Sequence, residues 1–165
     1  MSQAAVDRGA AVTLVTGPTH LATPVGVERV DVRTAEEMKE AVLEASGAAD
    51  ALLMAAAVGD YRPAEVAEQK MKKRAQDVTL RLTRTPDVLA VVAAQRAETN
   101  RPRVVVGFAA ETEDLLENAR HKMEAKKLDL VVANDVTAAD AGFGTETNRV
   151  VLLGRGGEAT ELPLM

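Results

Sequence analysis

Residues able to hold a phosphorylated ligand lie close together in the middle of the chain. The apolar run at 51–57 leads to Gly59 and Asp60, and a short loop continues into four basic residues, Lys70, Lys72, Lys73 and Arg74. A carboxylate at a strand end can bind a ribose hydroxyl, a base amino group or a metal ion, and a loop lysine can stabilise charge on a transferring phosphorus. The pattern favours a phosphate-binding site, although a turn-forming Asp60 and a solvated basic loop would give the same sequence.

Three other apolar runs also end in polar or turn-forming residues, at 16–19, at 111–112 and at 134–135. In an open α/β sheet, ligands bind beyond the carboxyl ends of the strands. Each of the four runs could end in an ordinary loop. Together they predict a binding site along one edge of a sheet.

Two further features fit a nucleotide. Lys122 and Lys126 are four residues apart on a predicted helix, so their ammonium groups project from one face and could hold a triphosphate. The alternative is a solvated helix face with neighbouring glutamates as partners. Phe108 could stack on a nucleobase or pack in the core.

The elements that must position these residues alternate along the chain. Strands are predicted at 10–16, 27–32, 51–57, 78–82, 103–108 and 128–133, and helices at 2–8, from the Thr34 cap to about 46, from the Thr85-Pro86-Asp87 start, and at 113–127. Two more strands, 150–153 and 159–162, form a terminal hairpin. The order predicts a Rossmann-like α/β fold, with an open, mostly parallel sheet, helices on both faces and a C-terminal β-hairpin.

Composition narrows the class of protein. The 165 residues suit a single domain, and the net charge of -5 argues against general nucleic-acid binding. There is no cysteine, the two histidines have no metal-ligand spacing, and no apolar run is long enough to span a membrane. The turn-rich segment 139–148 lacks the third glycine of a dinucleotide fingerprint. With no signal peptide pattern at its start, the sequence predicts a cytoplasmic protein.

These segments resemble the phosphopantothenoylcysteine synthetase family of coenzyme A biosynthesis, in its bacterial, cytidylate-forming version. The matching stretches are AAAVGDYRP with the following KMKK, TPDVL, VGFAAET, HKMEAKKLDLVVANDV and GFGTETNRV, and earlier VTLVTGPT and VDVRTAEEM. The resemblance implies a phosphopantothenate–cysteine ligase. The carboxylate of 4'-phosphopantothenate attacks the α-phosphate of CTP, pyrophosphate leaves, and the amine of L-cysteine attacks the acyl-cytidylate to give 4'-phosphopantothenoyl-L-cysteine and CMP.

The resemblance also implies roles for individual residues. Lys70 would be the catalytic lysine of a flap and would contact the nucleotide. The other residues implied in nucleotide binding are Met54, Ala55, Ala56, Asp60, Pro86, Asp87, Val88, Leu89, Phe108, Lys122 and Lys126, with Asn134 as a weaker contact to substrate. Mg²⁺ would screen the polyphosphate, and no metal site made of protein ligands is implied. The family forms homodimers, and its bacterial members are often fused to a flavin-dependent decarboxylase that acts on the product.

One departure from the family is at the start of the sequence. The family begins with a strand, a glycine-containing turn and an Asn-bearing loop, and this sequence enters at the helix that follows them. We therefore expect residues 1–165 to be one ligase domain that is incomplete at its N-terminus. Two alternatives stay open: an NAD(P)-dependent reductase, which requires a glycine fingerprint that the sequence does not contain, and a non-catalytic module for nucleotide binding or oligomerisation.

Overall fold

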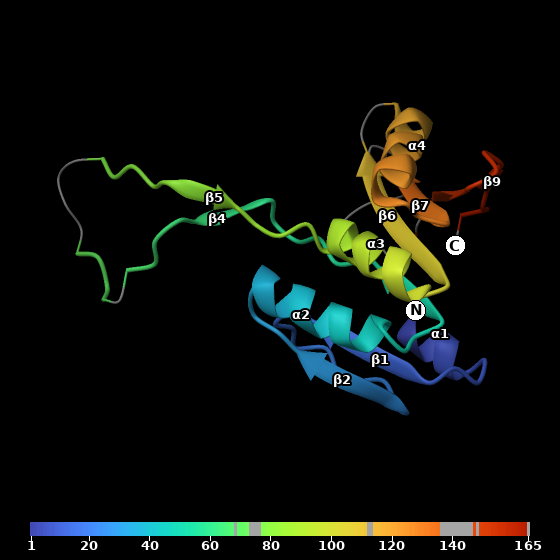
Figure 1. Ribbon diagram of the computed structural model, residues 1–165, viewed down its shortest axis with the longest axis horizontal. Coiled ribbons are helices and arrows are strands. Elements are labelled where there is room, and N and C mark those ends of the chain that lie inside the picture. Colours follow the sequence, from blue (N-terminus) through green and yellow to red (C-terminus); the bar gives the residue numbers. More distant parts are fainter. Residues whose placement is uncertain (68, 73–76, 112–113, 136–146, 148, 165) are drawn as a thin grey trace. The chain divides into compact units, whose positions relative to one another are not determined.

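The computed structural model describes residues 1–67, 69–72, 77–111, 114–135, 147 and 149–164 (Figure 1). The chain divides into two compact units. The first unit comprises Met1–Ala41 and Ala57–Val88, and the second comprises Val42–Ala56 and Leu89–Met165.

The first unit begins with the short helix α1 (Ser2–Val6) and the parallel strands β1 (Val12–Thr16) and β2 (Val27–Asp31). Helix α2 (Ala35–Ser46) follows; its residues up to Ala41 belong to this unit, and its start carries the predicted cap. The Glu37 N–H donates to the Thr34 hydroxyl at 3.1 Å, and the Glu37 carboxylate accepts from the Arg33 N–H at 2.7 Å. In a standard capping box, the glutamate carboxylate accepts instead from the N–H of the cap residue itself, which here is Thr34.

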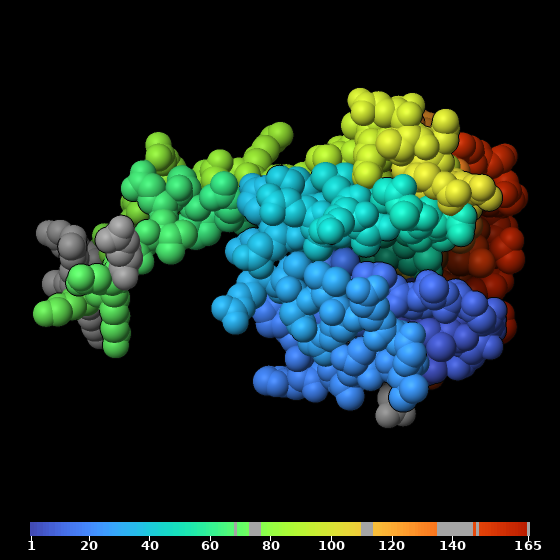
Figure 2. Space-filling model, turned by 60° about the horizontal axis from the view of Figure 1, so that its bottom comes forward, coloured from blue at the N-terminus to red at the C-terminus, as the bar shows by residue number. Residues whose placement is uncertain are grey.

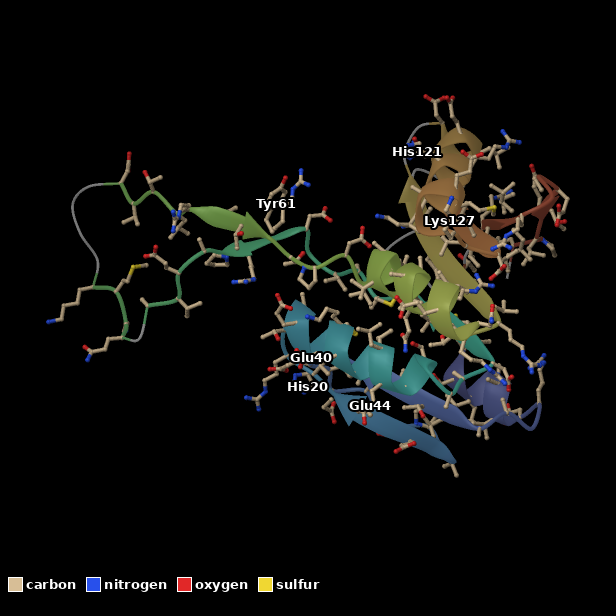
Figure 3. All side chains as sticks on the ribbon, in the orientation of Figure 1. His20, Glu40, Glu44, Tyr61, His121 and Lys127 are labelled. Atoms are coloured by element: carbon tan, nitrogen blue, oxygen red, sulfur yellow. The ribbon has the colours of Figure 1, made fainter. Side chains whose placement is uncertain are left out.

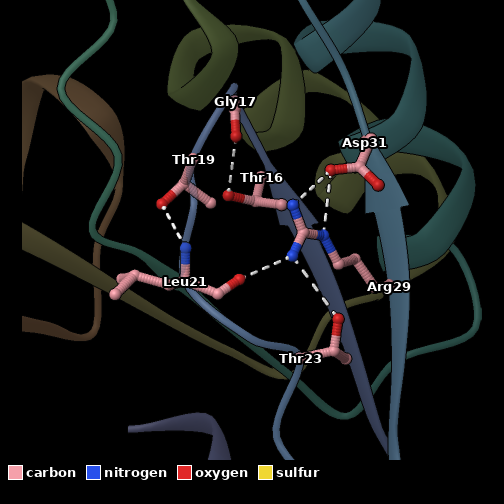
Figure 4. A network of polar contacts seen from close by, with 7 residues as sticks. All are labelled: Thr16, Gly17, Thr19, Leu21, Thr23, Arg29 and Asp31. Atoms are coloured by element: carbon pink, nitrogen blue, oxygen red, sulfur yellow. Dashed lines mark hydrogen bonds and ion pairs between the residues drawn. The ribbon is translucent and has the colours of Figure 1, made fainter.

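A polar network holds the loop at the carboxyl end of β1 (Figure 4). Arg29 on β2 donates two hydrogen bonds to the Asp31 carboxylate, at 2.9 and 2.6 Å. The same guanidinium donates to the Leu21 carbonyl at 3.0 Å and to the Thr23 hydroxyl at 3.4 Å. Because one planar fork contacts both the strand and the loop, residues 17–24 are tied to β2.

An antiparallel hairpin completes the first unit. Its strands are β4 (Tyr61–Pro63) and β5 (Leu82–Arg84), and the Ala64 N–H extends the ladder to the Arg81 carbonyl at 2.8 Å. In Figure 2 the hairpin residues, in green, extend away from the blue strands β1 and β2 of the same unit. Several large apolar side chains on this arm are exposed, among them Val66, Leu80 and Leu82.

The second unit is built on a five-stranded sheet. Its order is β3 (Ala51–Met54), β6 (Val104–Glu111), β7 (Leu130–Asp135), β8 (Val150–Gly154) and β9 (Ala159–Glu161). The first three strands pair in parallel, and β8 and β9 add to them as an antiparallel hairpin. Helices α3 (Val88–Thr99) and α4 (Leu115–Lys126) complete the unit. The α/β class, the parallel strands and the C-terminal hairpin are confirmed.

Helix α4 lies on the sheet formed by β6, β7 and β8. Leu128, just after this helix, is 1% exposed, and the neighbouring Val131 and Leu153 are fully buried. Gly107 makes the close approach possible, because a Cβ atom there would lie 2.5 Å from Leu128 Cδ1. A glycine inside a strand is expected where another segment comes this near.

Some predicted boundaries are wrong. The predicted strand 51–57 ends at Met54, because residues 55–58 join no ladder. The predicted strand 78–82 is displaced to Leu82–Arg84, where β4, which was not predicted, supplies its partner. Among the described residues, β1 and β2 pair in one sheet, and β3, β6 and β7 pair in another.

Two predicted helix starts are displaced as well. Helix α3 begins at Val88 rather than Pro86, and the Thr85 hydroxyl donates to the Gly59 carbonyl instead of capping the helix. Helix α4 begins at Leu115, because Asp114 has a left-handed backbone with φ of 49°. The turn-rich segment 139–148, apart from Thr147, and the basic residues Lys73 and Arg74 lie outside the described residues. No helix in the described part of the chain is long and apolar enough to cross a membrane.

Candidate functional site

In the second unit, candidate residues gather where the parallel strands end. Met54, the last residue of β3, is paired with Gly107 on β6, so it lies beside Phe108. Ala110 on β6 is paired with Asn134 on β7. Carboxyl ends of parallel strands meet at one edge of a sheet, which is where ligands bind in open α/β folds. The structure therefore brings together residues that are up to 80 positions apart (Met54 to Asn134).

Lys122 reaches this edge from α4. Its Nζ donates a hydrogen bond to the Phe108 carbonyl at 2.5 Å, and the residue is half-buried. The ammonium group therefore lies against the carboxyl half of β6, the position from which it could exchange the carbonyl for a phosphate oxygen. Lys126 follows one turn later on the same helix and is also half-buried. The spacing of the two lysines is confirmed as helical.

Asn134 carries an unusual polar atom. Its Oδ1 is buried and has no hydrogen-bond donor within the part of the chain that the structure describes. A buried acceptor without a donor costs free energy, so such atoms are normally satisfied by water or a ligand. The carbonyl of this side chain is thus available for a donor at the edge of the sheet.

The other candidate residues belong to the first unit. Asp60 and the segment 85–88 are joined at the base of the β4–β5 hairpin, where the Thr85 N–H donates to the Asp60 carbonyl at 2.9 Å. The Thr85 hydroxyl also donates to the Gly59 carbonyl. These bonds hold the exposed Asp60 near the half-buried Pro86 and the buried Val88. Thr85 was interpreted from the sequence as a helix cap, so this role was missed.

Lys70 lies in the segment that connects the two strands of the hairpin, far along the chain from its base. The side chain is exposed and makes no hydrogen bond or ion pair to another residue in the described ranges. Tyr61, at the start of the hairpin, is also exposed and is labelled in Figure 3. Within the first unit, Lys70 is thus separated along the hairpin from Asp60 and Pro86 at its base.

The structure thus arranges the candidate residues in three groups. The first group is the sheet edge of the second unit, with Met54, Ala55, Ala56, Phe108, Lys122 and Asn134. The second group is the hairpin base, with Asp60, Pro86, Asp87 and Val88, and the third is Lys70. Leu89, on α3, and Lys126, one turn after Lys122 on α4, also belong to the second unit. Ala55 and Ala56 are exposed beyond the end of β3. Within the described ranges, no three His, Asp or Glu side chains are close enough together to hold a metal ion.

Comparison with known proteins identifies the family. The model of the "DNA/pantothenate metabolism flavoprotein C-terminal domain" family matches residues 1–165. The "coenzyme A biosynthesis bifunctional protein CoaBC" of Bacillus subtilis is 45% identical over 166 residues, which are 100% of this chain and 40% of that protein. The Escherichia coli K12 protein of the same name is also 45% identical, over 99% of this chain and 40% of its own length.

A solved structure gives the same result. The crystal structure of the C-terminal domain of a coenzyme A biosynthesis bifunctional protein CoaBC is 35% identical and matches with a TM-score of 0.79. The match covers 99% of this chain and 70% of that one. The chain spans about 40% of the length of the curated relatives above. It belongs to the DNA/pantothenate metabolism flavoprotein C-terminal domain family.

Proposed function

We propose that the protein is a phosphopantothenate–cysteine ligase that uses CTP, with its two units acting as one domain. Membership of the family supports this, and so do relatives named for coenzyme A biosynthesis. The single observation that carries the proposal is the convergence of Met54, Phe108, Lys122 and Asn134 at the carboxyl edge of β3, β6 and β7. That edge supplies an apolar surface, a cation and an unsatisfied acceptor, which suit a base, a phosphate and a polar substituent respectively.

The residues at this edge have separate tasks in the first half-reaction. The exposed backbone of Ala55 and Ala56 contacts the nucleotide, and Phe108 lies against it. Lys122 and Lys126 hold the phosphates, which brings the α-phosphate within reach of the phosphopantothenate carboxylate. Attack forms the acyl-cytidylate and releases pyrophosphate, and positively charged side chains stabilise the negative charge that develops on the phosphoryl oxygens.

The hairpin contributes the remaining tasks. Asp60 binds the cytidine part from the hairpin base, next to Pro86, Asp87 and Val88. Lys70, on the flap, stabilises charge in the transition state. In the second half-reaction the cysteine amine attacks the acyl carbon, the amide bond forms, and CMP leaves.

A magnesium ion fits this arrangement only as part of the nucleotide complex. The described residues offer no cage of three ligands, but Mg²⁺ commonly takes its ligands from phosphates, water and one or two carboxylates. Asp60, exposed at the hairpin base, is the carboxylate that could contribute. The ion would neutralise polyphosphate charge.

A homodimer is part of the proposal, and the exposed apolar side chains of the hairpin support it. Six of them are more than half exposed: Tyr61, Val66, Met71, Val78, Leu80 and Leu82. An apolar arm of this kind marks an interaction surface, and we assign it to a second copy of the chain. The word "bifunctional" in the names of the relatives is consistent with a second activity, which we assign to a flavin-dependent decarboxylase, fused or associated.

The test is a pyrophosphate-release assay with phosphopantothenate, CTP and cysteine, using the protein as expressed from its natural reading frame. Release should require all three substrates, and Lys70→Gln should abolish product formation while CTP binding persists. Lys72→Gln is the matched control, because Lys72 is also exposed on the same loop. A folded protein without cysteine-dependent product would refute the ligase, and preferential binding of NADPH over CTP would favour a reductase instead.

A further inference from the structure

Thr85 closes the base of the β4–β5 hairpin, and the residues that it bonds belong to the first unit. The ladder between β4 and β5 (Figure 1) ends at the pair formed by Tyr61 and Arg84. In the same register Thr85 lies opposite Asp60, and its N–H donates to the Asp60 carbonyl at 2.9 Å. The Thr85 hydroxyl donates to the Gly59 carbonyl. One residue therefore supplies two hydrogen bonds that continue the hairpin beyond its ladder.

These two bonds hold two successive peptide planes. The Gly59 carbonyl belongs to the peptide that precedes Asp60, and the Asp60 carbonyl belongs to the peptide that follows it. Because each peptide is planar, a residue has only two soft backbone torsions, φ and ψ. Holding the planes on both sides of Asp60 restricts both of its torsions. The Cα–Cβ bond of Asp60, from which the carboxylate extends, is thereby held in one direction.

Packing contributes little to this segment. Gly59 and Asp60 are both exposed. Among the described residues, the nearest atom to a Cβ added at Gly59, outside its two chain neighbours, would be the Tyr61 carbonyl oxygen at 3.8 Å. A glycine also has the widest backbone freedom of any residue. The orientation of Asp60 therefore depends on the hydrogen bonds from Thr85 rather than on packing.

We propose that Thr85 is a positioning residue for nucleotide binding, which acts through the direction that it gives to the Asp60 carboxylate. The inference rests on the proposed role of Asp60 in binding the cytidine part of CTP. A carboxylate whose backbone is already held loses less conformational freedom when the ligand binds, so the affinity for the ligand is higher. Thr85 thus contributes to CTP affinity from the backbone of the hairpin base.

Thr85→Val tests this role, because valine keeps the branched Cβ and the backbone N–H and lacks the hydroxyl group. Isothermal titration calorimetry with CTP, on protein expressed from its natural reading frame, measures the affinity. Thr85→Val should bind CTP about three- to tenfold more weakly than wild type, the loss expected for one hydrogen bond. Thr85→Ser keeps the hydroxyl group and should bind CTP within about twofold of wild type.

A double-mutant cycle with Asp60→Asn separates positioning from a general loss of structure. Asp60→Asn should itself weaken CTP binding, and in its background Thr85→Val should change the affinity by less than about twofold, because the carboxylate is no longer there to be positioned. A purely structural role of Thr85 would give the same loss in both backgrounds.

Thr83→Val is the matched control. Thr83 is half-buried on the same strand, opposite Arg62, and its side chain makes no hydrogen bond to another described residue. This variant should bind CTP within about twofold of wild type. Amide exchange at residue 85, followed by NMR and corrected for its intrinsic rate, needs no nucleotide. It should rise by at least about threefold in Thr85→Val and stay unchanged in Thr83→Val.

The proposal is overturned if Thr85→Val binds CTP like Thr83→Val, if its loss persists in the Asp60→Asn background, or if amide exchange at residue 85 is unchanged. It also falls if Asp60→Asn binds CTP like wild type. If Asp60→Asn abolishes binding, the exchange rates decide. Wild type that binds CTP and gives no product would refute the ligase alone, whereas wild type that does not bind CTP would overturn both.

Discussion

Asp129 ties together four segments of the second unit. Its Oδ2 accepts a hydrogen bond from the Val105 N–H on β6 at 2.8 Å and lies 2.9 Å from a guanidinium nitrogen of Arg96 on α3. Its Oδ1 lies 2.8 Å from Arg155 in the turn between β8 and β9. The Asp129 N–H donates to the Val105 carbonyl at 2.9 Å. Replacing this one carboxylate should therefore destabilise the whole unit.

The burial of each pair sets the expected magnitude. The Arg96 and Asp129 side chains are only 19% and 22% exposed, so that bond should contribute about 1.5–3 kcal/mol. Arg155 is 61% exposed, so solvent screens its attraction and the pair contributes about 0–1 kcal/mol. Truncation also leaves the Val105 N–H without its acceptor. We expect Asp129→Ala to lower the free energy of unfolding by about 2–4 kcal/mol.

Urea unfolding followed by far-UV circular dichroism measures the effect. Fluorescence is a poor probe, because the chain has one tyrosine and no tryptophan. Two double-mutant cycles measure the interaction energies of Asp129 with its two arginine partners. One combines Asp129→Ala with Arg96→Gln, and the other combines Asp129→Ala with Arg155→Gln. Each cycle isolates the energy of that one ion pair from the other bonds that the residues make. The Arg96 cycle should give a coupling of at least about 1 kcal/mol and the Arg155 cycle less than that.

Asp50 provides the matched control. It pairs with Arg101 at 2.5 Å, but its side chain is 79% exposed, so Asp50→Ala should cost about 0–1 kcal/mol. The reasoning is refuted if Asp129→Ala costs no more than Asp50→Ala. Equal coupling energies for Arg96 and Arg155 would also refute it, since burial would then not decide the strength of the pairs.

Three further predictions concern stability. Gly107→Ala should lower the free energy of unfolding by about 1–3 kcal/mol, measured in urea, because its Cβ would press on Leu128; no loss would mean that this side chain moves aside freely. Thr34→Ala removes the acceptor that caps α2 and should cost about 1 kcal/mol in the same assay, whereas a Ser substitution should cost less. A hydrogen bond from Lys39 lowers the pKa of Glu36, so its contribution is present at neutral pH and is lost as pH falls through the folded-state pKa. Glu36→Gln should therefore flatten the acid side of the stability–pH curve, and an unchanged curve would contradict the assignment.

The sequence predicted correctly those elements whose hydrogen bonds join residues close together in the chain. The cap of α2 needs only Thr34 and Glu37, three residues apart, and the pair was found. The C-terminal hairpin is also local, with glycines between two short apolar runs. Strand β4 has no such signal: it has three residues, all exposed, and ends in Pro63. It exists because β5, about 20 residues later, pairs with it.

Thr85 shows how tertiary contacts override a local pattern. Thr85-Pro86-Asp87 reads as a helix start, because a threonine followed by proline and an acid is favourable there. In the structure the Thr85 hydroxyl and N–H are both used by the chain at 59–60, which is 25 or more residues earlier. The helix then begins at Val88. No sequence pattern at 85–87 could report that competition.

In the candidate site too, some features follow from local sequence and others depend on tertiary packing. The sequence could predict that Lys122 and Lys126 share a helix face, because that follows from helical geometry. It could not predict that Lys122 bonds the Phe108 carbonyl, since that bond requires α4 to lie close on β6, which depends on Gly107 opposite Leu128. A glycine 15 residues before Lys122 thus helps set where its ammonium group lies. The phosphate site would then depend on the packing of the sheet as much as on the lysine itself.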